Sequence, residues 1–122
     1  MIQGGCYCRA IRYEIEPGDS QVVNCHCSMC RRTSGAPFVT WILLSSEQFE
    51  LSVGQPTVLK SSDHGTRWFC DRCGTPISFQ SSKRPGKIDV TVCSLDDPNS
   101  CRPTEDLYVE GRLEWAHGIE VH

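Results

Sequence analysis

The sequence has 122 residues, a length that fits one domain with a hydrophobic core of its own, so we expect a single domain over residues 1–122. Its 12 Lys and Arg residues stand against 15 Asp and Glu residues, a net charge of -3 that argues against nucleic-acid binding, which needs clustered positive charge. The longest apolar run, around residues 41–44, is far too short to cross a membrane.

The first half of the chain predicts short strands separated by turns. The N-terminus lacks the charged and apolar regions of a signal peptide, so we expect a soluble, cytoplasmic protein. Ile11, Tyr13 and Ile15 alternate with polar residues, which is the period of a half-buried strand. The segment over 25–35 is expected to be a tight loop with at most one or two helical turns, and Gly35 is the expected stop. Strands are predicted over 10–16, 21–24, 36–44 and 49–53.

The second half continues the same pattern. Ile88, Val90 and Val92 share one face of a predicted strand, whereas Asp89, Thr91 and Cys93 share the other. No segment has a helical period longer than two turns. Further strands are predicted over 57–60 and 106–109, and residues 66–69 and 77–79 lead into and out of the Cys70–Cys73 motif. Many short strands with turn signals at close intervals indicate an all-β domain.

The nine cysteines favour metal sites over disulfides. Disulfides are rare in a reducing cytosol, and an odd number of cysteines argues against a complete disulfide framework. The spacings C-x-C, C-x-C-x-x-C and C-x-x-C are typical of metal ligands. An iron–sulfur cluster is a weaker alternative, because none of these spacings matches its usual runs.

Two cysteine pairs can complete one site. Cys70 and Cys73 with Gly74 have the form of a zinc knuckle, in which the glycine takes a left-handed conformation. Such a knuckle needs two more ligands, and Cys6 with Cys8 would complete a tetrahedron of four thiolates. The alternative is that Cys6 and Cys8 are ordinary buried thiols.

The stretch from Cys25 to Cys30 contains three thiols and no obvious fourth cysteine. Three thiolates on Zn²⁺ leave an open position, as catalytic zinc sites do. Arg31 and Arg32 follow directly and are candidates for holding a substrate carboxylate, although they could equally be solvated surface residues.

Three further residues each have two possible roles. His26 could be a general base, but an outward or hydrogen-bonded core histidine is the simpler interpretation. Cys93 is expected to be a small buried residue or to line the site. Cys101 is expected to be a free thiol in a polar turn, and the alternative, a Cys93–Cys101 disulfide, is disfavoured by a reducing compartment.

The ordered set of motifs resembles the glutathione-dependent formaldehyde-activating enzyme family. The resemblance rests on residues 5–8, 25–32, 35–38, 67–76, 88–90 and 95–98, and so covers nearly the whole chain. One departure is Arg9, which stands where the family usually has glycine.

The resemblance implies an all-β fold of the β-tent type, with sheets pinned by a zinc ion on four cysteines. It implies two zinc ions per chain: a structural zinc on Cys6, Cys8, Cys70 and Cys73, and a catalytic zinc on Cys25, Cys27 and Cys30. It also implies a carbon–sulfur lyase whose partner is a small-molecule thiol, with S-hydroxymethylglutathione formed from glutathione and formaldehyde as the named reaction.

Two other functions compete with this one. A zinc-stabilised module that binds a protein partner without catalysis has precedent in β-tent domains, by analogy of fold alone. A methionine sulfoxide reductase of the B type would need a nucleophilic cysteine outside the zinc ligands. Only Cys93 and Cys101 are available for that role, and their contexts do not resemble its motif.

Overall fold

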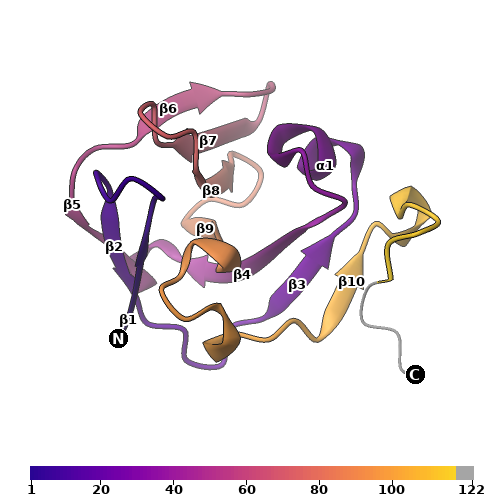
Figure 1. Cartoon of the computed structure of the whole chain (residues 1–122), viewed down its shortest axis with the longest axis horizontal. Helices are drawn as coiled ribbons and strands as arrows, with labels where there is room; N and C mark the ends of the chain where they lie inside the picture. Colours follow the sequence, from indigo (N-terminus) through magenta and orange to yellow (C-terminus); the bar gives the residue numbers. More distant parts are fainter. Residues whose placement is uncertain (118–122) are drawn as a thin grey trace.

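The computed structural model describes residues 1–117 and consists mostly of strands in two sheets (Figure 1). The smaller sheet has the strand order β1-β2-β5, and the larger has the order β10-β3-β4-β9-β8-β7-β6. The strands are β1 (Ile2–Gly5), β2 (Arg12–Ile15), β3 (Val22–Cys25), β4 (Val39–Ser45), β5 (Phe49–Val53), β6 (Thr57–Lys60), β7 (Gly65–Phe69), β8 (Pro76–Ser81), β9 (Lys87–Thr91) and β10 (Glu105–Leu107). The prediction of an all-β fold is confirmed.

One α-helix, α1 (Ser28–Ser34), occurs in the described part of the chain. Its N-cap is Cys27, whose sulfur accepts a hydrogen bond from the backbone N–H of Cys30. It ends at Gly35, which has the left-handed φ of 69° expected of a glycine stop. No helix within residues 1–117 is long and apolar enough to cross a membrane.

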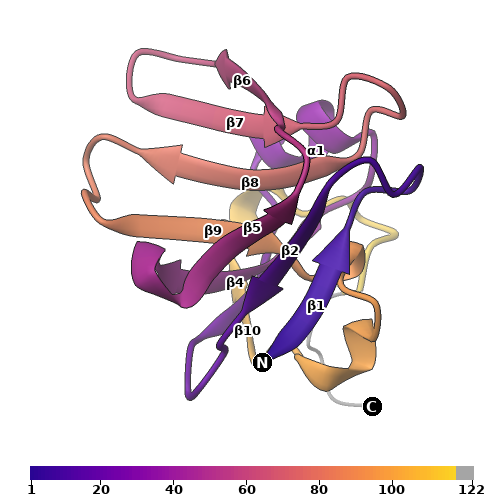
Figure 2. The same cartoon turned by 90° about the vertical axis from the view of Figure 1, so that its left-hand side faces the viewer.

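The main core lies where the smaller sheet crosses over one face of the larger sheet (Figure 2). Strand β2 contributes Tyr13 and Ile15, both with no exposed surface. The Tyr13 hydroxyl pairs with Ser94 Oγ at 2.6 Å, which satisfies the polar end of a buried ring. The larger sheet contributes Ile42 and Leu44 from β4 and Ile88 and Val90 from β9.

The opposite face of the larger sheet carries a different set of side chains. Alternate residues of a strand point to opposite faces, so Trp41 and Asp89 turn away from the main core. The strand register places Asp89 beside Phe79, and Phe79 beside Arg67 on the next strand. Cys25 and Trp41 belong to a second, smaller apolar cluster that is packed on by Phe79. This face, with α1 beside it, forms the candidate site.

Strand β1 was not expected from the sequence, because Gly4 and Gly5 have little strand propensity. Both positions require glycine because neighbouring atoms leave no room for a side chain. A Cβ at Gly4 would lie 2.5 Å from the Tyr13 hydroxyl oxygen, and one at Gly5 would lie 2.2 Å from the carbonyl oxygen of Ile11. The pairing of β1 with β2 therefore depends on small residues rather than on an apolar pattern.

The two remaining cysteines lie differently from their expected positions. Strand β9 ends at Thr91, and a 3-10 turn over Val92–Ser94 leaves Cys93 exposed rather than buried, where it lines a cavity of about 300 Å³ that Trp41 also lines. Cys101 is a free thiol, as expected, but it is buried against the main core.

Candidate metal centres

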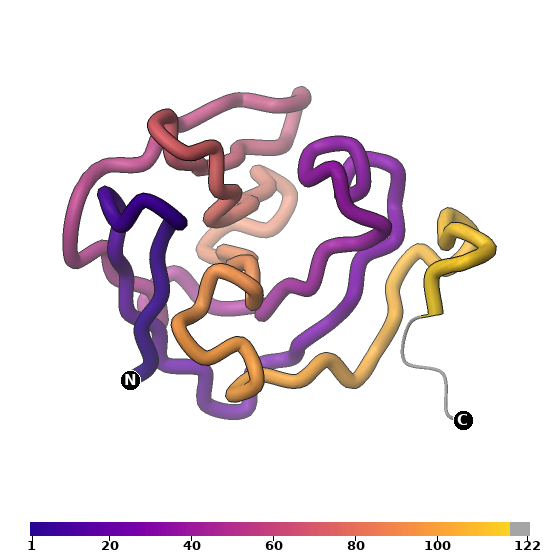
Figure 3. Tube along the Cα trace, in the orientation of Figure 1, coloured from indigo at the N-terminus to yellow at the C-terminus, as the bar shows by residue number. Residues whose placement is uncertain are grey.

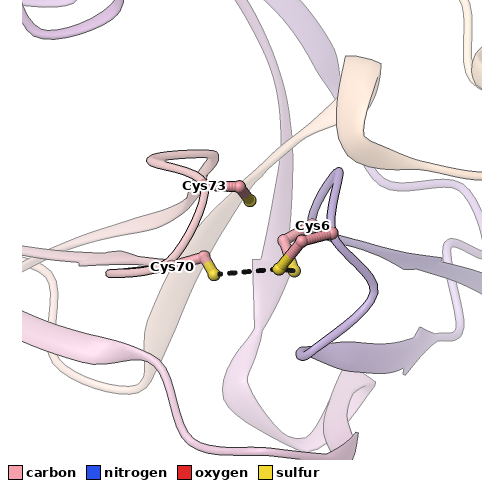
Figure 4. Close-up of side chains that lie close together, drawn as sticks. Cys6, Cys70 and Cys73 are labelled. Carbon is pink, nitrogen blue, oxygen red and sulfur yellow. Dashed lines mark hydrogen bonds between the residues drawn. The ribbon is translucent and has the colours of Figure 1, made fainter.

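Two cysteine pairs that are far apart in the sequence come together at one site. The sulfur atoms of Cys6, Cys8, Cys70 and Cys73 all lie within 4.8 Å of one another. Figure 4 shows the sulfurs of Cys6, Cys70 and Cys73 turned toward a common centre. The Cys6–Cys8 and Cys8–Cys70 sulfur distances are 3.6 and 3.7 Å. A tetrahedral zinc ion with bonds of about 2.3 Å separates its thiolates by about 3.8 Å, so the four thiols fit it.

Two tight turns carry these thiols, one near the N-terminus and one after β7, and the Cα trace in Figure 3 shows the path of the chain through both. In the knuckle, Gly74 has a φ of 81° and its N–H donates to the carbonyl of Cys70 at 2.7 Å. In the N-terminal turn, Arg9 has a left-handed φ of 68°, the conformation that favours the glycine usual at this position. The Ile11 N–H donates to the Cys6 sulfur at 3.2 Å, the kind of bond that stabilises a thiolate.

Thr75 joins the two turns. Its hydroxyl oxygen accepts a hydrogen bond from the Tyr7 N–H at 3.1 Å and lies 3.2 Å from the Cys73 sulfur, to which the hydroxyl proton is free to point. The Thr75 hydroxyl, helped by the Thr75 backbone N–H, lowers the pKa of Cys73 to about 5. A thiol with that pKa is already a thiolate at neutral pH, which is the form that binds metal.

Replacing Thr75 by valine is expected to weaken metal binding at the four-thiol cluster about 10- to 100-fold, because hydrogen bonds to ligands typically contribute this much. Valine preserves the shape of threonine but cannot donate to Cys73. A chelator competition on the variant and on the native protein measures the effect. Thr104→Val, which changes an exposed threonine elsewhere, is the matched control. Equal competition curves for all three proteins would contradict the assignment.

The second cluster comes from one short stretch. Cys25 ends β3, Cys27 caps α1 and Cys30 lies in its first turn. The Cys25 and Cys27 sulfurs are 3.3 Å apart, and all three lie within 4.8 Å of one another. Within residues 1–117, no other His, Cys, Asp or Glu side chain joins this group.

Two interactions favour a thiolate at Cys30. The neighbouring Cys25 thiol has the largest effect in lowering the pKa of Cys30, and the Trp41 Nε1–H, which donates to the Cys30 sulfur at 3.4 Å, lowers it further. The pKa of Cys25 is raised by the same hydrogen bond to Cys30 and by burial. The donor set is therefore three soft ligands with one vacancy in a tetrahedron, which fits Zn²⁺ with an exchangeable fourth ligand.

The three thiols line a cavity of about 660 Å³. Ligand-binding cavities commonly have volumes of about 300–1,000 Å³, so it can hold a small peptide or metabolite. Apolar side chains supply much of its wall, among them Trp41, Phe79 and Leu107. The polar part includes Arg67, Arg84 and Asp89.

Asp89 is a buried carboxylate in the wall of this cavity, 7% exposed. Burial raises its pKa, whereas the Arg84 guanidinium opposes that shift with two hydrogen bonds of 2.6 and 3.3 Å. Because the pair is bidentate, Asp89 compensates most of the positive charge of Arg84.

The arginines singled out in the sequence lie elsewhere. Arg31 is half-buried and Arg32 is exposed on α1, and neither lines the cavity that holds the three thiols. Their role in substrate binding stays a prediction. His26 is a core histidine with no exposed surface, and its Nε2 lies 2.8 Å from an Asp106 carboxylate oxygen.

Sequence reasoning missed the residues that the sheet brings to the thiols. Trp41 falls in the strand predicted over 36–44, but nothing in the sequence showed its bond to Cys30. Arg67 and Phe79 come from strands far away in the sequence. A usable signal was Asp89, a charged residue inside an apolar strand, because a buried charge requires a partner.

Comparisons with known proteins agree with this geometry. A protein of Halomonas elongata, named provisionally as a glutathione-dependent formaldehyde-activating enzyme, is 26% identical over 127 aligned positions, covering 95% of this chain and 80% of that protein. A protein of Schizosaccharomyces pombe named as an uncharacterised lyase is 30% identical over 116 positions, covering 81% of this chain and 82% of that protein.

A crystal structure of a Rhodobacter sphaeroides protein, solved as a structural genomics target, has the same fold. Its TM-score is 0.70 at 23% identity, and the match covers 86% of this chain and 99% of that one. The sequence model of one family matches residues 1–111. The chain therefore belongs to the glutathione-dependent formaldehyde-activating enzyme family.

Proposed function

We propose that this protein is a zinc-dependent carbon–sulfur lyase whose thiol substrate is glutathione and whose aldehyde is formaldehyde. The observation that carries the proposal is the convergence of Cys25, Cys27 and Cys30 on the wall of a cavity of about 660 Å³, with no fourth ligand among residues 1–117. The family description and the lyase name of one relative support an enzyme rather than a non-catalytic binding module.

We assign different roles to the two clusters. Cys6, Cys8, Cys70 and Cys73 form a closed set of four thiols, which suits a structural zinc. Cys25, Cys27 and Cys30 form an open set of three, which suits a catalytic zinc. The proposal therefore requires two zinc ions per chain, both held by thiols of the single domain.

The proposed reaction is an addition without net redox change. Cys25, Cys27 and Cys30 would hold the zinc ion, which would supply a Lewis acid. The thiol sulfur forms a bond to the formaldehyde carbon as the carbon–oxygen π bond breaks, and the thiol proton ends on the new hydroxyl oxygen. In the lyase direction the carbon–sulfur bond of S-hydroxymethylglutathione breaks and the same proton returns to sulfur.

The chain's own residues supply the setting for this reaction. Trp41 donates to the Cys30 sulfur and so holds this thiolate in place while glutathione and formaldehyde approach. Phe79 and Leu107 keep part of the wall apolar, which lowers the local dielectric and strengthens electrostatic interactions in the cavity. Arginine side chains on the wall suit glutathione, which carries two carboxylates.

We place the protein in the cytoplasm on the basis of its cysteines. All nine are free, and seven of them form the two clusters. Thiolate ligands of this kind need a reducing compartment to avoid oxidation before metal arrives.

The proposal predicts that purified protein contains two zinc ions per chain and accelerates the exchange between glutathione, formaldehyde and S-hydroxymethylglutathione. Elemental analysis gives the metal content, and exchange NMR under equilibrium conditions gives the rate in both directions. S-methylglutathione, which has no free thiol, is the substrate control. Fully zinc-loaded protein that accelerates the reaction with neither glutathione nor any other small thiol would contradict the proposal.

A further inference from the structure

Three cationic side chains line the cavity that holds the three-thiol cluster, and they differ in whether an acidic side chain compensates their charge. They are Arg67, Lys83 and Arg84. Arg84 forms a bidentate pair with Asp89, and Lys83 is an exposed side chain. Arg67 is half-buried, and no carboxylate within residues 1–117 lies within ion-pair distance of it. Arg67 is thus the half-buried cation of the wall that lacks an acidic partner in the described chain.

The Arg67 guanidinium lies over an aromatic ring and forms no ion pair with the described residues. Its central carbon lies 4.7 Å from the centroid of the Phe79 ring, its neighbour across the β7–β8 ladder. A cation–π contact does not require the guanidinium N–H groups as hydrogen-bond donors to an acid, and no hydrogen bond of the Arg67 side chain occurs within residues 1–117. The geometry therefore presents a preorganised fork of donors that nothing in the described chain fills.

A short series of contacts connects this fork to the thiols. The Phe79 and Trp41 rings lie 6.4 Å apart between centroids, and Trp41 Nε1 donates to the Cys30 sulfur. Arg67 and Trp41 also line a second cavity of about 300 Å³. Both residues thus lie where the two cavities adjoin, so a molecule longer than its thiol group passes Arg67 as it extends away from the cluster.

We propose that Arg67 binds a carboxylate of the thiol substrate and so selects anionic, peptide-like thiols over neutral ones. This inference rests on the proposed function and names the residue that gives it specificity. A guanidinium binds a carboxylate through two parallel hydrogen bonds, which fixes orientation as well as affinity. With the carboxylate held, the substrate sulfur is directed to Cys25, Cys27 and Cys30 instead of sampling the whole cavity.

The competing explanation is that Arg67 only offsets the negative charge of the thiolate cluster. The two explanations differ in what happens when the substrate's carboxylates are masked. Charge compensation acts on every thiol alike, whereas carboxylate binding acts only on thiols that carry a carboxylate.

The test uses Arg67→Gln and Arg67→Lys in the zinc-loaded protein, with glutathione, glutathione diethyl ester and 2-mercaptoethanol as thiols. We expect Arg67→Gln to raise the KM for glutathione about 10- to 100-fold, as loss of a charged hydrogen-bond pair does. The KM for the ester and for 2-mercaptoethanol is expected to change less than threefold. Arg67→Lys, which keeps the charge without the fork, is expected to lie in between.

Arg102→Gln is the matched control, because it removes one exposed positive charge that lines none of the cavities described here. Arg31→Gln and Arg32→Gln serve as comparisons. Equal losses for all three thiols in Arg67→Gln would overturn the proposal in favour of charge compensation. A loss confined to glutathione in Arg31→Gln or Arg32→Gln, with Arg67→Gln unaffected, would overturn it in favour of those residues.

Calorimetric binding of glutathione without aldehyde gives a readout that does not depend on turnover. Tighter binding of glutathione than of its ester, lost in Arg67→Gln, supports the inference even if the native protein shows no catalysis. The absence of catalysis together with this binding result would refute the proposed activity but not the role of Arg67. Equal binding of glutathione and its ester by the native protein would refute the role of Arg67. Melting curves and zinc content establish that each variant is folded before these comparisons are made.

Discussion

Replacing Cys73 by alanine is expected to unfold the domain at room temperature. Cys8 and Cys70 are 62 residues apart in the chain, and apart from the Tyr7–Thr75 hydrogen bond it is the four-thiol cluster that connects their two turns. Metal binding at a structural zinc site contributes about 10–16 kcal/mol to folding, which is comparable with the whole stability of a typical domain, about 5–15 kcal/mol. Cys6 and Cys70 also lie in the main core, so losing the ion leaves unpaired thiols between the two sheets.

Circular dichroism and zinc content of the purified variant measure this effect. Cys93→Ala, which removes an exposed cysteine outside both clusters, is the control and is expected to change the melting temperature by no more than a few degrees. A Cys73→Ala protein that melts as cooperatively as the native protein would show that the four-thiol cluster is not structural.

Replacing Cys27 is expected to have the opposite combination of effects: a folded domain without activity. The three-thiol cluster spans one stretch between β3 and the first turn of α1, so it closes no long loop. Cys27→Ala removes one ligand and also the N-cap bond from Cys30 N–H, which costs about 1 kcal/mol. Cys27→Ser retains a side chain that caps helices well and removes only the thiolate.

Both Cys27 variants are therefore expected to bind one zinc ion instead of two, to remain folded, and to lose carbon–sulfur activity by about 100- to 1,000-fold, as removal of one transition-state-stabilising group does. Ser28→Ala, a truncation of the exposed neighbouring residue, is expected to retain both ions and full activity. If Cys27→Ser unfolds as readily as Cys73→Ala, both sites are structural and the proposed enzyme function fails.

The sequence predicted the cysteine groups and most strands because both depend on local pattern. Spacing alone assigned Cys70 and Cys73 to a knuckle, and the φ of 81° at Gly74 agrees with that prediction. The alternation around Tyr13 and the boundaries of β6 were also predicted closely. The pairing of the two distant cysteine pairs followed from ligand counting, and the structure brings their sulfurs together.

The rest of the site depends on strand register, which spacing does not encode. Arg67, Phe79 and Asp89 become neighbours only because β7, β8 and β9 pair in one register. The proximity of Arg31 and Arg32 to the cysteines in sequence favoured them, but the turn of α1 leaves both outside the lining of the cavity. Strand β1 was missed because Gly4 and Gly5 are required by close approaches to Tyr13 and to the Ile11 carbonyl, and propensity does not encode these.

The separation of 62 residues between Cys8 and Cys70 also sets an order of events during synthesis. At about 5–20 residues per second, the N-terminal pair leaves the ribosome roughly 3–12 s before the knuckle that completes its site. The three-thiol cluster lies in one short stretch of sequence, so Cys25, Cys27 and Cys30 emerge almost together and can bind an ion at once. In the two-zinc protein that we propose, the open cluster is therefore complete first, and the closed one is complete only after Cys73 has emerged.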